Sequence, residues 1–94
     1  MDSSALKVAI LRLIEQNDKT GAGNYLDDTV IASRLGVELD EVQRQLLILE
    51  SRSLVELAKT FGPSYSALLT PGGMEALEGL NSAVPSTPKR AIGF

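Results

Sequence analysis

The chain has 94 residues, enough for one small domain, and its formal net charge at pH 7 is −3. It contains no cysteine and no histidine, which excludes disulfides, thiolate chemistry, and the most common general base and metal ligand. No carboxylates are spaced as an obvious acid–base pair either. We therefore expect a protein that is not an enzyme and that carries no cofactor and no metal.

The first predicted element is a helix from about Ser4 to Gln16 or Asn17, which Ser3 or Ser4 can cap. Residues at helical spacing define one apolar face: Leu6, Ile10, Leu13 and Ile14. Val8 and Leu11 lie off that face. They predict either an interface with a second copy or another protein, or a helix that packs on two neighbours, and we favour the interface.

The same segment is not a signal peptide, because Lys7 and Arg12 interrupt its apolar run and no small-residue cleavage site follows. The run is also too short and too charged to span a bilayer. We expect a cytoplasmic protein with no membrane contact.

Two consecutive helices are predicted next, after a very short strand at Tyr25 and Leu26. The first begins at Asp27 or Asp28 and ends at Gly36, a residue that adopts the left-handed conformation at little cost. The second begins at Glu38 or Asp40 and ends near Arg52. Its inner face is marked by residues at three- and four-residue spacing: Leu39, Val42, Leu46 and Leu49.

A hairpin and a last helix complete the predicted domain, residues 1–81. Strands are expected at Leu54–Ala58 and Tyr65–Leu69, with a turn at Gly62-Pro63 between them. Thr70-Pro71 is a helix start, and Met74, Leu77 and Leu80 are expected on the inner face of that helix. Residues 82–94 are polar, contain prolines and lack periodicity, so they predict a flexible tail or linker. The predicted fold is mostly α with a small β-hairpin, in the order α-β-α-α-β-β-α.

Three segments carry a resemblance to a known family. Ile31–Val37 looks like a helix with its turn, Val42–Val55 looks like a second helix that continues into a strand, and Leu68–Gly73 looks like a strand-to-helix junction. In this order and spacing the chain resembles the winged helix-turn-helix domains of MarR-like and related small transcriptional regulators. The resemblance covers roughly residues 5–81 and implies a dimeric regulator that binds double-stranded DNA.

The resemblance also implies a DNA-binding surface in three parts. The second of the paired helices would enter the major groove, while the first helix and the hairpin, or wing, would contact the backbone. The corresponding positions are Asp40, Gln43, Arg44 and Leu47 on the second helix, Thr29, Ser33 and Arg34 on the first, and Lys59 and Ser64 on the wing. Glutamine pairs with adenine and arginine with guanine. The alternative is that Gln43 and Arg44 are ordinary solvent-facing residues.

Two features depart from the family pattern. The second helix begins with three carboxylates, Glu38, Asp40 and Glu41, which would repel phosphates. Ser53 stands where the family has glycine, so we expect the exit from this helix to be either strained or closed in a different way. The acidic balance favours a second hypothesis, a winged-helix module for protein–protein interaction or dimerisation that is the N-terminal part of a larger protein.

Overall fold

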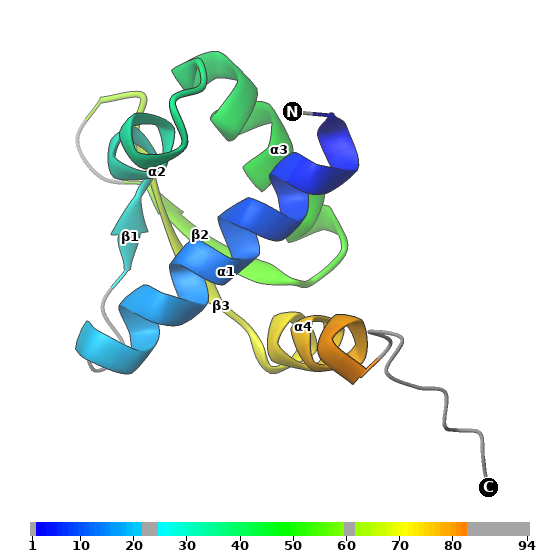
Figure 1. The fold of residues 1–94 in the computed structure, drawn as a ribbon. Coiled ribbons are helices and arrows are strands. Elements are labelled where there is room, and N and C mark those ends of the chain that lie inside the picture. The colour runs from blue at the N-terminus through cyan, green and yellow to red at the C-terminus, as the bar shows by residue number, and fades with distance from the viewer. Residues whose placement is uncertain (1, 22–24, 60–61, 83–94) are drawn as a thin grey trace, which may run out of the picture.

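The computed structural model describes residues 2–21, 25–59 and 62–82, which form four helices and a small three-stranded antiparallel sheet. The elements are α1 (Ser3–Gly21), β1 (Leu26–Asp27), α2 (Asp28–Leu35), α3 (Leu39–Ser51), β2 (Val55–Lys59), β3 (Tyr65–Leu69) and α4 (Pro71–Ser82) (Figure 1). Their order is the predicted one. From residue 83 onward the predicted tail lies outside the described residues. Among the described residues, no helix combines the length and the apolar character needed to cross a membrane.

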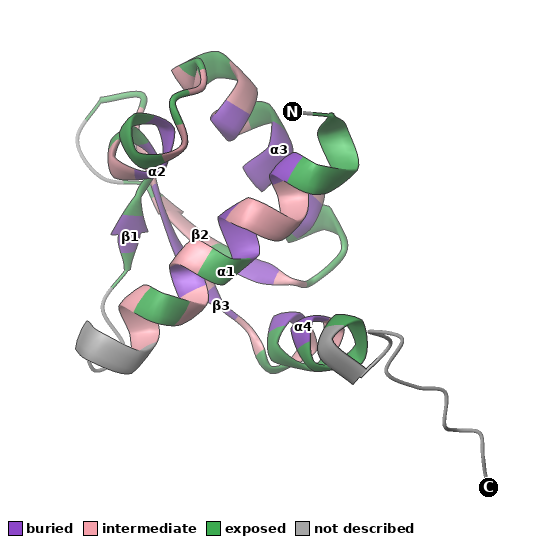
Figure 2. Cartoon of the chain, in the orientation of Figure 1, coloured by how far each residue is buried: buried purple, intermediate pink, exposed green. Residues whose placement is uncertain are grey.

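Helix α1 crosses the middle of the domain and packs against α2, α3, α4 and β3 (Figure 1). Figure 2 shows buried residues along the helix and on the elements around it. Leu11 is one of them, with 3 % of its surface exposed, so the prediction that it lies at an interface is wrong. Val8 is half-buried. A helix surrounded by several elements buries more than one stripe, and the off-face residues of α1 therefore belong to the core or its edge.

The ends of α1 also differ from the prediction. The carboxylate of Asp2, rather than a serine, caps the helix by accepting a hydrogen bond from the Ala5 N–H at 2.8 Å. The helix continues to Gly21 instead of ending by Asn17. The predicted loop residues Asn17 to Thr20 are only modest helix breakers, and no proline forces the chain out of the helix before the first glycine.

The sheet has the strand order β1-β3-β2, with Leu26 and Leu57 both opposite Ala67. Side chains of one face are buried against the helices, among them Val55, Ala67 and Leu69. At the other face the Tyr25 hydroxyl donates a hydrogen bond to Glu56 Oε2 at 3.2 Å. This bond raises the pKa of Tyr25, because the neutral phenol is the donor.

Helix α4 begins very close to the strand that precedes it. Leu77 is buried, whereas Met74 and Leu80 are exposed, so only one of the three predicted inner residues belongs to the core. Gly73, the residue before Met74, is buried instead. A Cβ atom at Gly73 would lie 2.2 Å from the Leu54 carbonyl oxygen, and this close approach of backbones positions the inner face of α4.

Candidate nucleic-acid interface

The paired helices α2 and α3 are joined by a tight turn at Gly36. Gly36 has φ 66°, in the left-handed region, and its N–H donates to the Ala32 carbonyl to close the end of α2. The next residues are extended, and α3 starts after Glu38, whose carbonyl accepts the N–H groups of Glu41 and Val42. The glycine that the sequence predicted as the stop of α2 therefore sets the direction of α3.

The outward face of α3 carries three of the four predicted groove residues. Asp40, Arg44 and Leu47 are exposed, and their spacing places them on one side of the helix. Leu47 is 46 % exposed, which is high for a leucine on a helix whose opposite face is in the core. This face combines an acidic, a basic and an apolar side chain within about two turns.

Arg44 is not a free cation in this structure. Its guanidinium forms an ion pair with Glu41 one turn earlier. Glu41 also accepts a hydrogen bond from the buried Gln45 at 3.1 Å, and Gln45 in turn donates to the Ser3 hydroxyl at 3.1 Å. Lys7 donates to the same hydroxyl at 2.8 Å. This row of polar contacts joins the start of α3 to the start of α1.

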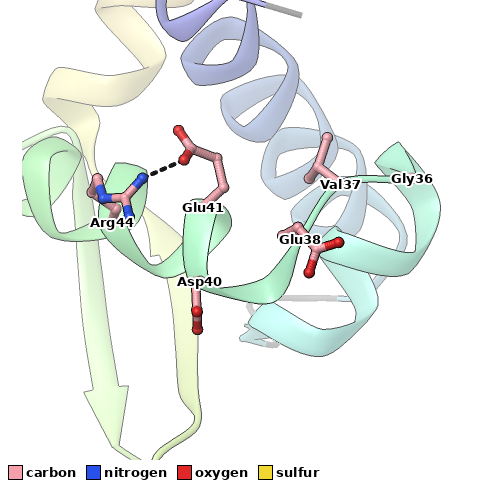
Figure 3. A pocket seen from close by; sticks show the side chains of 6 residues that line it. All are labelled: Gly36, Val37, Glu38, Asp40, Glu41 and Arg44. Carbon is pink, nitrogen blue, oxygen red and sulfur yellow. Dashed lines mark hydrogen bonds and ion pairs between the residues drawn. The ribbon is translucent and has the colours of Figure 1, made fainter.

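A surface hollow of about 460 Å³ lies beside the turn between α2 and α3. Its lining residues are Gly36, Val37, Glu38, Asp40, Glu41 and Arg44. Figure 3 shows Arg44 and Glu41 pointing toward one another, while Asp40 points away from that pair. The three carboxylates make the N-terminal end of α3 acidic. Its C-terminal half carries Leu47, and exposed Arg52 follows its last residue.

Gln43, predicted to read adenine, is half-buried, and its side chain is hydrogen-bonded to other residues of the protein. Its Nε2 atom donates one hydrogen bond to Asp28 Oδ2 at 2.8 Å and one to the Pro63 carbonyl at 3.1 Å. An amide nitrogen has two hydrogens, so both donors of Gln43 are in use. Bidentate recognition of adenine needs one of those donors, so Gln43 would have to give up a hydrogen bond within the protein to take the predicted role.

Asp28 is the residue that sequence reasoning missed. The sequence predicts it only as a possible helix start, but its side chain is fully buried at 0 % exposure. Oδ2 accepts hydrogen bonds from Gln43 of α3 and from the Tyr65 N–H of β3, the latter at 2.9 Å. Asp27 is the N-cap residue, and its carboxylate accepts from the buried Ser66 hydroxyl at 2.7 Å rather than from the helix backbone. Two aspartates at a helix start predict a cap. No local sequence pattern shows that the side chain of one of them binds other helices or strands instead.

The remaining predicted contacts lie on α2 and on the β2–β3 hairpin. Thr29, Ser33 and Arg34 are exposed on α2. On the hairpin, Lys59 is exposed and Ser64 is half-buried. The Lys59 ammonium lies 5.8 Å from the centre of the Tyr65 ring, a cation–π contact that limits where this lysine points.

Comparison with known proteins gives a likeness of fold. No family model matches the chain, and no curated protein matches it. The crystal structure of AF1382 from Archaeoglobus fulgidus is similar, with a TM-score of 0.67 and 22 % sequence identity over 81 % of this chain and 80 % of that chain. The two proteins therefore share an arrangement of helices and strands over most of their lengths.

Proposed function

We propose that the chain is a winged helix-turn-helix domain that binds double-stranded DNA as a transcriptional regulator and has no catalytic role. The observation that carries the proposal is the outward face of α3. This helix follows α2 after the left-handed turn at Gly36, and the β2–β3 hairpin comes directly after it. In this proposal α3 enters the major groove and the β2–β3 hairpin is the wing beside it.

The exposed residues of α3 have the chemistry for base contacts. Arg44 would leave Glu41 and donate to guanine, Asp40 would accept from the amino group of cytosine, and Leu47 would contact the methyl group of thymine. Groups for the phosphate backbone lie on α2 and on the wing: Thr29, Ser33, Arg34, Lys59 and Ser64. Gln43 is left out of the base contacts because its donors are already bound.

The number of cations that contact phosphates determines how strongly this binding should depend on salt concentration. Arg34 and Lys59 are the cations assigned to the phosphate backbone, and each neutralised phosphate contributes about −0.9 to the slope of log K against log salt concentration. Two such contacts give a slope of about −1.8, far shallower than that of a strongly basic DNA reader. Binding is therefore expected at low salt, with moderate loss at physiological salt.

The test is titration of duplex DNA at both salt concentrations with wild type, Arg44→Ala and Arg12→Ala. Arg12→Ala is the matched control, because it removes an exposed cation from α1 that is not assigned to DNA. Arg44→Ala should weaken binding at low salt and make it less dependent on sequence, while Arg12→Ala should bind as wild type does. A wild-type protein that does not bind duplex even at low salt would overturn the proposal.

One observation favours a second function, a winged-helix interaction module that dimerises or binds another protein. Glu38 and Asp40 are exposed at the start of α3, and exposed Leu47 lies on the same helix beside an arginine that Glu41 neutralises. An apolar side chain within an acidic surface suits a protein partner better than phosphates. Sedimentation equilibrium of wild type and Leu47→Asp tests the homodimeric form. If the module dimerises through this face, the wild type is a dimer and Leu47→Asp is a monomer.

A further inference from the structure

The buried carboxylate of Asp28 joins three elements that the proposed function requires to be held together. Asp28 lies in the first turn of α2, and its Oδ2 atom accepts one hydrogen bond from α3 and one from β3. The donors are Gln43 Nε2 and the Tyr65 N–H, 15 and 37 residues away along the chain. A carboxylate that accepts both bonds fixes the distance between α3 and the start of β3.

The second donor hydrogen of Gln43 extends this connection to the turn of the hairpin. It binds the Pro63 carbonyl, two residues before Tyr65. The wing is therefore fastened at two neighbouring points, once directly to Asp28 and once through Gln43. Lys59, the cation of the wing, pairs with Tyr65 across the β2–β3 ladder and lies over its ring.

Resting on the proposed DNA binding, we propose that Asp28 and Gln43 are positioning residues that set the wing against α3. They hold the Lys59 ammonium at the place where it meets phosphate while α3 lies in the groove. Gln43 does not read a base, and sequence preference comes from Asp40, Arg44 and Leu47. Nothing in the sequence marks Asp28 for this role, because an aspartate at a helix start has a simpler explanation as a cap.

The first experiment needs no DNA. Hydrogen exchange of the Tyr65 amide is compared in wild type, Asp28→Asn and Asp28→Ala. Asparagine keeps an oxygen that can accept both hydrogen bonds, whereas alanine removes it. We expect slow exchange in wild type and Asp28→Asn, and exchange at least about tenfold faster in Asp28→Ala.

The Thr70 amide is the internal control, because it donates to the Leu54 carbonyl at the other end of the hairpin. It should stay protected in all three proteins. Protection of Tyr65 that is unchanged in Asp28→Ala would overturn the positioning role. If Asp28→Ala does not fold, Gln43→Ala replaces it: loss of the Pro63 bond should lower the NMR order parameter of Ser64 and leave that of Thr70 unchanged. An unchanged value at Ser64 would also overturn the role.

The second experiment couples Asp28 to Lys59 in DNA binding. Lys59→Ala and Asp28→Ala should each make the salt slope shallower by about 0.9, the contribution of one phosphate contact. The double variant should show the same slope as either single variant, because both changes remove the same contact. Asp28→Asn removes the same formal charge as Asp28→Ala but should keep the wild-type slope, which separates position from electrostatics.

Additive changes in slope would mean that Asp28 and Lys59 act independently, and they would overturn the proposal. Failure of the wild type to bind duplex at low salt is a different result. It would remove the DNA-binding function, while the exchange of the Tyr65 amide would still decide whether Asp28 holds the hairpin.

Discussion

The turns before and after α3 contain the same left-handed backbone conformation, but at different residues. Before the helix, Gly36 has φ 66°, and after it, Ser53 has φ 62°. Glycine adopts this left-handed region freely, whereas a residue with a Cβ atom does so at a cost of roughly 1–2 kcal/mol. The turn at Gly36 is therefore free of strain, whereas the turn at Ser53 is strained and must be held by neighbouring residues.

Hydrogen bonds hold the strained end. The Leu54 N–H donates to the Leu49 carbonyl, and the Thr70 hydroxyl donates to the Ser53 carbonyl at 2.6 Å. The Gly73 backbone also lies directly against the Leu54 carbonyl. The turn at Gly36 needs only local chemistry, while the turn at Ser53 depends on α4. Four substitutions test this difference, from the largest expected effect to the smallest.

Gly73→Ala should have the largest effect, because it places a methyl group where the strained exit is held. The new Cβ would lie 2.2 Å from the Leu54 oxygen and 2.6 Å from Leu69 Cδ1, so α4 must move. We expect the free energy of unfolding, measured with urea, to fall by about 3 kcal/mol. Gly79→Ala is the control in the same helix: no atom lies within 4 Å of its Cβ, and it should stabilise the protein by up to about 1 kcal/mol.

Thr70→Val should come next. The hydroxyl of Thr70 donates to the Ser53 carbonyl and accepts the Gly73 N–H at 3.0 Å, so it binds the end of α3 and caps α4 at once. Valine keeps the shape and removes both bonds, which should lower the free energy of unfolding by about 2 kcal/mol. Thr70→Ser keeps the hydroxyl and should retain most of the stability. Equal losses in the two variants would show that the hydroxyl is unimportant.

Gly36→Ala measures the cost of the left-handed conformation alone. Open space surrounds the position of the new Cβ, with nothing within 4 Å. We expect a loss of about 1–2 kcal/mol in thermal or urea unfolding, together with weaker duplex binding if the direction of α3 changes. A variant as stable as wild type would mean that this turn does not require glycine.

Ser53→Gly is the converse change and should have the smallest effect, with the opposite sign. It relieves the strain at φ 62° but also increases the conformational freedom of the unfolded chain. The net gain should be about 0.5–1 kcal/mol, visible as a higher Tm. If Ser53→Gly destabilises the protein, then the serine side chain makes a contribution that outweighs the backbone strain.

The sequence was informative where a local rule decides the structure. The element order and the stop of α2 at Gly36 follow from helical spacing and from which residues tolerate positive φ, while the strain at Ser53 was one of two outcomes that the family resemblance implied. It was less informative where packing decides. Leu11 lies off the main apolar stripe of α1, yet it is buried because several elements surround that helix. Met74 fits the stripe of α4, but the close contact at Gly73 turns it outward.

The candidate site divides in the same way. Exposure of Asp40, Arg44 and Leu47 follows from their place opposite the core residues of α3. The use of both Gln43 donors within the protein could not be predicted, because their acceptors, Asp28 on α2 and Pro63 before β3, meet Gln43 only in the tertiary structure. Long-range hydrogen bonds of this kind leave no periodicity in the chain.

The Tyr65–Lys59 contact also has a practical consequence. The chain contains two tyrosines and no tryptophan, so its intrinsic ultraviolet fluorescence comes from Tyr25 and Tyr65. Tyr25 precedes β1, and Tyr65 begins β3 with its ring beneath the Lys59 ammonium. Replacing Tyr25 with phenylalanine would leave Tyr65 as the single tyrosine emitter, at the end of the β2–β3 ladder next to the hairpin turn. The protein then carries its own unlabelled optical reporter of how this hairpin responds to any ligand.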